Sequence, residues 1–463
     1  MSSQVYSDPG KTKFHVIIDT DGGMDDLRAI CMILAWKEFE ILAITTSNGI
    51  CSSGQAYHKV TGLLDHFGHQ GIPVGMGKKM DIGREPCMEK VGKLPWAGNN
   101  RGNNKGQIEA VELIHKTAEQ EDQPVYFLGL GPLTNLSAYL TEQNNKNIRL
   151  VWLNEDPSLS GGTNYNFDRD AAESVSVGID NLTIVTPPAE SIFLDGHFTE
   201  GLKNTEGRYS ELLHKLHSSE KYAFLKGKEA FKMGDELVPL YLAYPGLFNV
   251  SGTEIKTARY KGERDEAIQK SMVLLSGNTN MSNTFNSFPV DEELYAEDVK
   301  EIVKKVIGNY GREEWRVGVL TQELHGHFGI YSIIGTKMGL RARDYFNIGI
   351  DDLAIVSYAG RKPPLSCMND GLQVSTGGTL GHGLISVSEE TPHLPAATFE
   401  FKGRKVGLEL KQEYWQQIKE DIGKTIEKCG ALTPEYWQEV RRLALGYWIE
   451  FSRHDIFELE QLH

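Results

Sequence analysis

The amino-acid sequence predicts an α/β fold, with a mostly parallel sheet flanked by helices, followed by a smaller α+β domain. Between residue 14 and about residue 250, apolar strand-like runs alternate with helical patterns, an order typical of a parallel sheet covered by helices on both faces. The chain has 463 residues, more than one hydrophobic core usually holds, so we expect more than one domain. Residues 324–383 are rich in glycine and histidine and do not continue the alternation of strands and helices, so they mark the second domain.

The expected elements follow from local signals. Apolar runs predict buried strands at residues 14–18, 41–45, 125–130, 148–153 and 184–186. Apolar residues at helical spacing predict helices at residues 27–36, 55–67, 106–119, 133–140 and 296–307. Residues 309–314 are polar and indicate a connector, so we place the domain boundary near 305–315, between domains 1–308 and 309–463. Residues 411–462 are charged and aromatic and predict a mostly helical C-terminal tail.

Composition narrows the class of protein. The net charge is -15, from 48 basic and 63 acidic residues, which argues against nonspecific binding to nucleic acid or to an anionic membrane. The five cysteines are widely spaced and form no CxxC pair, so we expect a reducing compartment, no disulfide framework and no zinc ribbon. Residues 1–13 are polar and no apolar run approaches transmembrane length, so the expectation is a cytoplasmic enzyme.

An acidic run directly follows the first expected strand. Residues 19–26 contain four carboxylates, those of Asp19, Asp21, Asp25 and Asp26, at the carboxyl end of a strand, where open α/β sheets place their ligands. Like charges this close repel unless a cation lies among them or some of them bind protons. Oxygen ligands favour a hard cation such as Ca²⁺ or Mg²⁺. The simpler alternative is an acidic helix N-terminus stabilised by the helix dipole.

Four segments in order make residues ~14–305 resemble the inosine-uridine preferring, calcium-dependent nucleoside hydrolases. The family's DxDxGxDD signature is matched from Asp19 to Asp26, and its GPLTN turn is matched in full at residues 131–135. Its EFNxxxDPEAA segment is matched loosely at residues 164–172. Asp235, followed by a PxLF tail at residues 245–248, matches the fourth segment.

The resemblance implies a role for each matched residue. Calcium would be bound by the carboxylates of Asp21, Asp26 and Asp235 and by the backbone carbonyl of Leu130. Asp21 would also act as the general base toward a calcium-bound water, and Asp19 would orient its neighbours. Asp25 and Asn166 would hold ribose hydroxyls, Asn166 within the catalytic set, and Asn164 aligns with a family Glu near the ribose 5′-hydroxyl. The reaction would be hydrolysis of the N-glycosidic bond of a ribonucleoside or related N-riboside.

The chain also departs from the family pattern. Many members carry a His before the last calcium Asp to protonate the leaving base, and this chain has Gly234 there. Loss of such an acid lowers the reaction rate by roughly 10²–10⁴-fold. The sequence therefore does not identify the leaving group. Taken alone, Asp235 is equally well explained as a helix N-cap. The alternative for Asn166 is a turn residue.

Two other functions remain open at this level. The segment Asp19-Thr20-Asp21-Gly22 resembles the nucleophile loop of haloacid-dehalogenase-type phosphatases, in which Asp19 would be phosphorylated and Mg²⁺ would lie nearby. A non-catalytic protein that binds a metal and a riboside is the other alternative. The partner is a small-molecule nucleoside in the first interpretation, and the family resemblance suggests a homo-oligomer.

The second domain, from about residue 315 to the end, resembles the formylmethanofuran dehydrogenase E-subunit family. Its first motif is matched in part by His325-Gly326-His327, and its second by residues from Cys367 to Gly383. The resemblance implies that His327 or His325, together with Cys367, binds a transition metal. Imidazole and thiolate ligands suit Zn²⁺. The Cys usually found two residues after the second His is Gly329 here. The alternative is that the glycines form tight turns and the histidines are ordinary surface or core residues.

Overall fold

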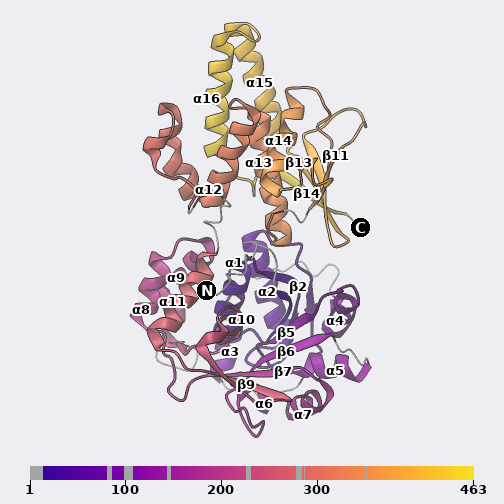
Figure 1. Cartoon of the computed structure of the whole chain (residues 1–463), viewed down its shortest axis with the longest axis vertical. Helices are drawn as coiled ribbons and strands as arrows, with labels where there is room; N and C mark the ends of the chain where they lie inside the picture. Colours follow the sequence, from indigo (N-terminus) through magenta and orange to yellow (C-terminus); the bar gives the residue numbers. More distant parts are fainter. Residues whose placement is uncertain are drawn as a thin grey trace, which may run out of the picture. The chain divides into compact units, whose positions relative to one another are not determined.

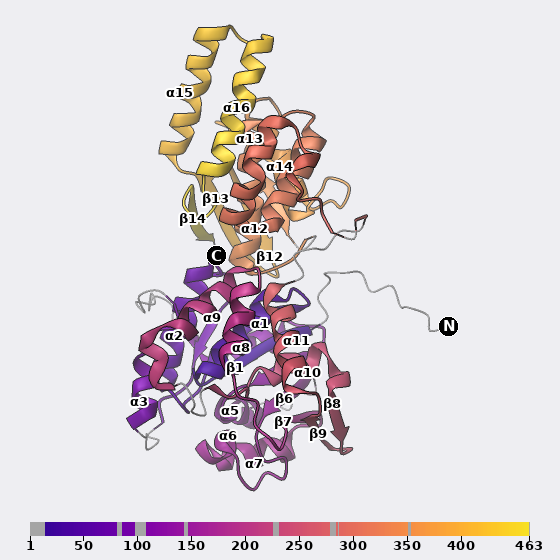
Figure 2. The same cartoon turned by 90° about the vertical axis from the view of Figure 1, so that its left-hand side faces the viewer.

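The computed structural model describes residues 14–80, 86–97, 108–142, 147–225, 231–277, 284–285, 287–350 and 353–462. These residues form two compact units, one containing the described residues up to 277 and the other those from 284 onward (Figures 1 and 2). The division lies earlier in the chain than the boundary that the sequence predicts near 305–315. Each unit has its own sheet.

The described part of the first unit contains a nine-stranded sheet in the order β4-β3-β2-β1-β5-β6-β7-β9-β8. All neighbouring strands in it are parallel except β8 and β9, which are antiparallel. The mostly parallel sheet predicted from the sequence is therefore confirmed. The strands are β1 Phe14–Thr20, β2 Phe39–Thr46, β3 Val74–Met76, β4 Ile108–Glu109, β5 Val125–Gly129, β6 Ile148–Leu153, β7 Leu182–Thr186, β8 Phe248–Ser251 and β9 Ile255–Tyr260.

Helices cover both faces of this sheet because successive strand side chains point to opposite sides. In β1, Val16 and Ile18 pack into one core with α1, α9 and α11, whereas Ile17 packs into the other with α4, α5 and α7. Figure 1 shows these two sets of helices. The helices are α1 Met24–Ala35, α2 Ser53–Phe67, α3 Pro86–Lys93, α4 Ala110–Glu119, α5 Thr134–Glu142, α6 Thr163–Phe167, α7 Arg169–Gly178, α8 Gly196–Asn204, α9 Arg208–Ser218, α10 Leu237–Ala243 and α11 Arg264–Ser276, with 3₁₀ turns at Glu220–Leu225 and Pro245–Leu247.

The strand order places a topological switch point beside β1. This strand pairs with β2 on one side and with β5, far along the chain, on the other. Successive connections leave the sheet in opposite directions here, and the crevice that results at the carboxyl ends of the strands is where open α/β sheets bind ligands. The acidic turn after β1 and the 131–135 turn after β5 both lie at this edge.

The second unit is an α+β structure, as predicted. Its described residues form a five-stranded sheet in the order β11-β10-β12-β13-β14, in which only the β10–β11 pair is parallel. The buried helix α13 packs closely on α14. The elements are a 3₁₀ turn at Glu292–Leu294, α12 Glu297–His325, α13 Ile330–Phe346, β10 Ala354–Ser357, a 3₁₀ turn at Leu365–Cys367, α14 Met368–Thr376, β11 Ile385–Val387, β12 Ala396–Phe401, β13 Arg404–Leu410, α15 Gln412–Cys429, α16 Pro434–Glu450 and β14 Phe457–Leu462.

The predicted connector at residues 309–314 is helical instead. Helix α12 continues through it with a kink at Gly311, whose φ of 87° suits glycine. Two polar residues of this stretch have partners elsewhere in the second unit, which the linear pattern does not reveal. The Tyr310 hydroxyl donates a hydrogen bond to the carbonyl of Ile449, and Glu314 pairs with Lys337.

The predicted helical tail is also an integral part of the second unit. Helices α15 and α16 are present, but the chain then ends in β14, which pairs antiparallel with β13 and closes one edge of the sheet. The alternation of apolar residues and Glu at 457–460 is the strand signal. Among the helices that the structure describes, none combines the length and apolar character needed to cross a membrane.

Candidate functional site at the switch point

The acidic turn is fixed by hydrogen bonds to the carboxylate of Asp26. This residue lies in the first turn of α1, and its Oδ2 accepts a hydrogen bond from the backbone N–H of Gly23 at 3.0 Å. Its Oδ1 accepts one from the Thr20 hydroxyl and one from the backbone N–H of Asp21, the latter at 3.2 Å. Gly22 adopts a φ of 82°, which turns the chain from the strand into the helix. The carboxylate therefore shapes the turn besides facing the site.

Asp19 lies beneath the site, fully buried. Its Oδ1 accepts hydrogen bonds from the Thr45 hydroxyl at 2.6 Å and from the side-chain amide of Asn135 at 2.7 Å. Burial raises the pKa of Asp19 to about 6, and these hydrogen bonds act in the opposite direction. The supporting place predicted for Asp19 fits this geometry, whereas a phosphatase nucleophile would have to reach its substrate. Asn135 belongs to the 131–135 turn, so the turn's hydrogen bond to Asp19 is a contact that the motif alone did not assign.

Asp21 is buried and tightly enclosed. Its Oδ2 accepts a hydrogen bond from the backbone N–H of Ile50 at 3.0 Å. A Cβ atom built on Gly49 would lie 2.0 Å from that oxygen, and one built on Gly131 would lie 3.1 Å from the Asp21 Cβ. Glycine at both positions therefore leaves the space that the carboxylate occupies.

Three carboxylates converge at this turn. Asp25, Asp26 and Asp235 each present an oxygen, and these three atoms all lie within 4.8 Å of one another. A Cβ atom built on Gly23 would meet oxygens of Asp26 at 2.7 Å, of Asp25 at 2.8 Å and of Asp21 at 3.8 Å. The structure thus gathers Asp26 and Asp235 as the sequence predicts. It adds Asp25, predicted to bind ribose. Asp21 is not in this group of three, and its Oδ2 is held by Ile50.

The electrostatics of the group favour a bound cation. Burial, the negative charge of Asp26 and further carboxylates raise the pKa of Asp21 and of Asp235 well above the ordinary range. The same causes raise the pKa of Asp25 to about 7. Asp235 Oδ1 is buried and has no hydrogen-bond partner among the described residues. A donor set of carboxylate oxygens alone fits a hard cation such as Ca²⁺, so these residues fit the group that the family resemblance implies.

The three remaining predicted residues follow β5 and β6. Asn164 is buried, and its side-chain amide donates to the carbonyls of Leu130 at 3.2 Å and Leu153 at 3.1 Å. It therefore holds the two strand ends together and also touches the carbonyl predicted to bind calcium. Asn166 is exposed, and its Oδ1 accepts a hydrogen bond from Arg169 at 3.1 Å.

Gly234 borders the same group. A Cβ atom built on it would lie 2.7 Å from Asp25 Oδ2. The space that a His side chain at this position would enter is therefore next to the Asp25 carboxylate.

Two buried cations near the acidic turn were not predicted. Arg28 of α1 forms an ion pair with Glu236. Lys59 of α2 donates hydrogen bonds to the carbonyl of Gly22 at 2.9 Å and to that of Val91 at 3.0 Å. A charged residue inside the otherwise apolar stretch 27–35 was the one available signal for Arg28.

The predicted zinc ligands of the second unit do not converge in the same way. His325 Nδ1 lies 2.7 Å from Asp370 Oδ2, and its ring packs on that of His327 with centroids 4.3 Å apart. Cys367 is half-buried. Within the described ranges, no group of three ligand atoms within 4.8 Å includes these residues. His325 Nε2 faces Gly329, where a Cβ would lie 2.9 Å away, so the position that lacks the expected Cys borders this imidazole. Zinc binding there stays a prediction.

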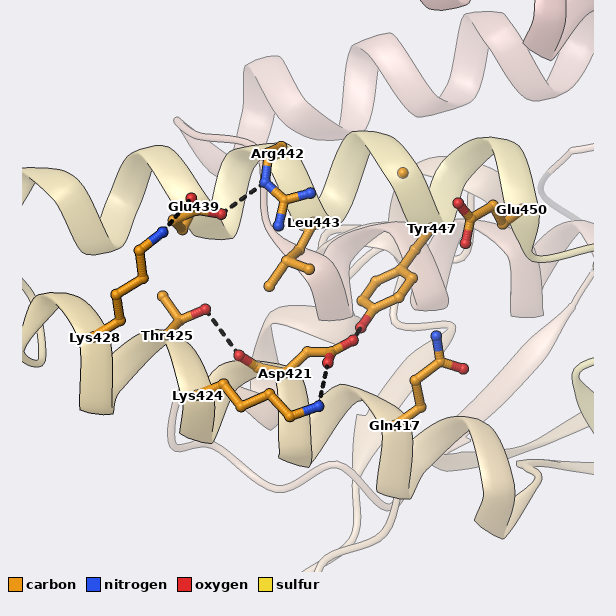
Figure 3. Close-up of a pocket in the computed structure, with 11 residues that line it drawn as sticks. Gln417, Asp421, Lys424, Thr425, Lys428, Glu439, Arg442, Leu443, Tyr447 and Glu450 are labelled. Atoms are coloured by element: carbon orange, nitrogen blue, oxygen red, sulfur yellow. Dashed lines mark hydrogen bonds and ion pairs between the residues drawn. The ribbon is translucent and has the colours of Figure 1, made fainter.

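A groove of about 400 Å³ lies between α15 and α16 (Figure 3). Its charged side chains largely pair with one another. The Tyr447 hydroxyl donates to Asp421 at 2.7 Å, Lys424 contacts the same carboxylate at 3.4 Å, and Arg442 contacts Glu439 at 2.7 Å. No predicted site residue lines the groove, so it is separate from both predicted sites.

Comparisons with known proteins agree with this geometry. The family profile described as inosine-uridine preferring nucleoside hydrolase matches residues 16–287, more than half of the chain. A second profile, described as FmdE, molybdenum formylmethanofuran dehydrogenase operon, matches residues 324–452. The first unit is a parallel-sheet domain with a carboxylate site at its switch point. The chain belongs to the inosine-uridine preferring nucleoside hydrolase family, and its second unit is similar to FmdE.

Individual relatives are similar to this protein over part of its sequence. A probable uridine nucleosidase 2 of Oryza sativa subsp. japonica is 27% identical over 226 residues, covering 44% of this chain and 65% of that protein. The pyrimidine-specific ribonucleoside hydrolase RihA of Salmonella schwarzengrund (strain CVM19633) is 30% identical over 183 residues, covering 35% of this chain and 56% of that protein. The chain thus spans less than two thirds of the length of these curated relatives. The solved purine-preferring ribonucleoside hydrolase from Gardnerella vaginalis aligns with 57% of this chain and 98% of its own, at 16% identity and a TM-score of 0.49.

Proposed function

We propose that this protein hydrolyses the N-glycosidic bond of a ribonucleoside or related N-riboside in a Ca²⁺-dependent reaction. The observation that carries the proposal is the convergence of Asp25, Asp26 and Asp235 within 4.8 Å, beside Asp21, at the switch point of a sheet whose sequence belongs to the nucleoside hydrolase family. Uncompensated, these buried carboxylates repel one another, and a divalent cation removes that cost.

The cation would be bound by the carboxylates of Asp26 and Asp235, and by that of Asp25 or Asp21. When bound, Ca²⁺ would supply positive charge that favours deprotonation of a nearby water. Asp21 would accept the proton of the attacking water, because its carboxylate lies beside the group and is held in place by the Ile50 N–H. The positive charge that develops on the sugar as the base leaves would be stabilised by the surrounding carboxylates.

Several groups near the site would position the ribose. Asp25 is only partly buried, and its carboxylate oxygens can accept hydrogen bonds from ribose hydroxyls. Asn166 is exposed near the same edge. Its side-chain amide would contact the substrate once its hydrogen bond with Arg169 is broken. Gly234 supplies no acid, so we expect faster turnover for substrates whose leaving group needs no protonation.

A turnover assay on purine, pyrimidine and nicotinamide ribosides, with Ca²⁺ and with chelator, tests the proposal. Uridine is tested first because both curated relatives are named for uridine or pyrimidine nucleosides. We expect chelator-sensitive release of free base and ribose, and a loss of roughly 10²-fold or more in Asp21→Asn, since the amide cannot accept the proton. Turnover that persists in chelator would refute calcium dependence. Calcium binding without turnover of any riboside would favour the non-catalytic alternative, and release of inorganic phosphate from phosphate esters would favour the phosphatase.

A further inference from the structure

The carboxylates of the proposed cation site come from two distant parts of the chain. Asp25 and Asp26 lie in the first turn of α1, whereas Asp235 lies in the segment 231–236 that precedes α10. Asp235 Oδ1 has no hydrogen-bond partner among the described residues. The placement of this oxygen therefore depends mainly on the backbone of its own segment.

One buried ion pair joins these two parts. Arg28 is three residues after Asp25 on α1, and its Nε contacts a carboxylate oxygen of Glu236, the residue next to Asp235. Both side chains are only 1% exposed. Arg28 also donates from a terminal nitrogen to the carbonyl of Lys232 at 2.9 Å. The guanidinium thus contacts the segment at two points, one on each side of Asp235.

The second oxygen of Glu236 turns back onto the same segment. It accepts a hydrogen bond from the backbone N–H of Gly234 at 2.9 Å. One end of the segment is held to an earlier stretch of the chain, where the Met233 N–H donates to the carbonyl of Ile192 at 2.8 Å. The carboxylate of Glu236 therefore fixes the two residues that flank Asp235 in the chain, and Arg28 fixes that carboxylate to α1.

We propose that the Arg28–Glu236 ion pair is a positioning pair that sets the distance between Asp235 and the Asp25–Asp26 turn, and so determines the affinity of the site for Ca²⁺. The inference rests on the proposed function. Residues that orient metal ligands without contacting the metal typically lower the metal affinity by about 10–100-fold when they are removed. Arginine suits this task because its planar fork makes directed contacts to two acceptors at once, whereas lysine offers a point charge.

Calcium binding to the full-length protein, measured by isothermal titration calorimetry, tests the inference alongside the melting temperature in chelator. The informative variant is Arg28→Met with Glu236→Leu. Replacing both partners of a buried ion pair by apolar side chains usually preserves stability, but here it also removes the link to Asp235. We expect a melting temperature somewhat below that of the wild type, because the Lys232 carbonyl and the Gly234 N–H lose these partners, and a Ca²⁺ dissociation constant about 10–100-fold higher. The Ca²⁺ dissociation constant of Arg28→Lys is expected to fall between those of the wild type and the double variant.

The Lys337–Glu314 pair provides a matched control. It is fully buried but lies in the second unit, so Lys337→Met is expected to lower the melting temperature and leave Ca²⁺ affinity unchanged. Wild-type Ca²⁺ affinity in the double variant would overturn the inference and leave the proposed function standing. An equal loss of affinity in Lys337→Met would also overturn it, because the effect would then follow general destabilisation. Absence of Ca²⁺ binding by the wild-type protein would overturn the proposed metal site and this inference together.

Discussion

Gly49 provides a steric test of the proposed base. The residue follows β2 and faces the carboxylate of Asp21, whose Oδ2 is held by the backbone N–H of Ile50 at 3.0 Å. A Cβ atom on Gly49 would lie 2.0 Å from that oxygen and 2.8 Å from the Asp21 Cγ. Gly49→Ala therefore cannot be accepted unless the carboxylate moves, and moving it breaks the Ile50 hydrogen bond.

The size of the displacement follows from the same distances. An ordinary contact begins at 3.4 Å and the built atom lies at 2.0 Å, so the oxygen must move by about 1.4 Å. Misplacement of a catalytic group by about 1 Å costs roughly 10²-fold in rate, which corresponds to about 2.7 kcal/mol. Overpacking of a buried site costs about 1–3 kcal/mol in the free energy of unfolding. We therefore expect kcat/KM to fall by about 100-fold or more in a protein that remains folded at 25 °C.

The measurements are kcat/KM on the riboside that the wild-type enzyme cleaves, the Ca²⁺ dissociation constant and the melting temperature. Gly54→Ala in the nearby helix α2 is the control, because the nearest atom to its new Cβ is the Met76 sulfur at an ordinary 3.7 Å. It is expected to match the wild type in activity and to be equally or more stable. Wild-type kcat/KM in Gly49→Ala would refute the placement of Asp21 as the base, and an equal loss in Gly54→Ala would refute the steric explanation.

Three further outcomes follow from the charges. Asp235→Asn is expected to weaken Ca²⁺ binding by about 100-fold or more, measured by calorimetry. It is also expected to raise the melting temperature in chelator at pH 7.5, because it removes a buried carboxyl that repels its neighbours. A lower melting temperature would contradict this. Burial raises the pKa values of Asp19 to about 6 and of Asp25 to about 7, so the native state binds more protons than the unfolded state and the chelated protein should lose stability as pH rises from about 4 to about 7. Added Ca²⁺ should then stabilise it more at pH 7.5 than at pH 5 in thermal melts. Lys337→Met should lower the free energy of unfolding of the second unit by about 1–3 kcal/mol in denaturant titrations, because the buried Glu314 loses one of its two cationic partners and keeps only Arg453, at 2.8 Å.

Much of the fold and of the candidate site follows from local sequence patterns. A strand buried on both faces is a continuous apolar run, and a ligand site at its end is a cluster of polar residues directly after it. Phe14–Thr20 and the carboxylates from Asp19 to Asp26 are adjacent in the chain, so both the parallel sheet and the gathering of carboxylates at this edge could be predicted. The second unit's α+β class was predictable for the same reason.

The errors arose where a partner lies far along the chain. The connector predicted at residues 309–314 is part of α12. Its residues Tyr310 and Glu314 bind Ile449 and Lys337, which lie far enough along the chain that the sequence does not reveal the contacts. A polar stretch looks like a loop until its partners are known. The C-terminal strand β14 was missed because its pairing with β13 depends on a fold that brings the two together.

The sequence by itself determined which chemical groups this protein offers: the run of carboxylates after β1, the turn after β5 and the Asp before α10. Only the tertiary structure decided which of them meet. It joined Asp25 to the group with Asp26 and Asp235, and it paired Arg28 with Glu236 across 208 positions of the chain. The physical reason is that ligand type is a property of single residues, whereas the distance between ligands depends on how the strands and helices that carry them pack.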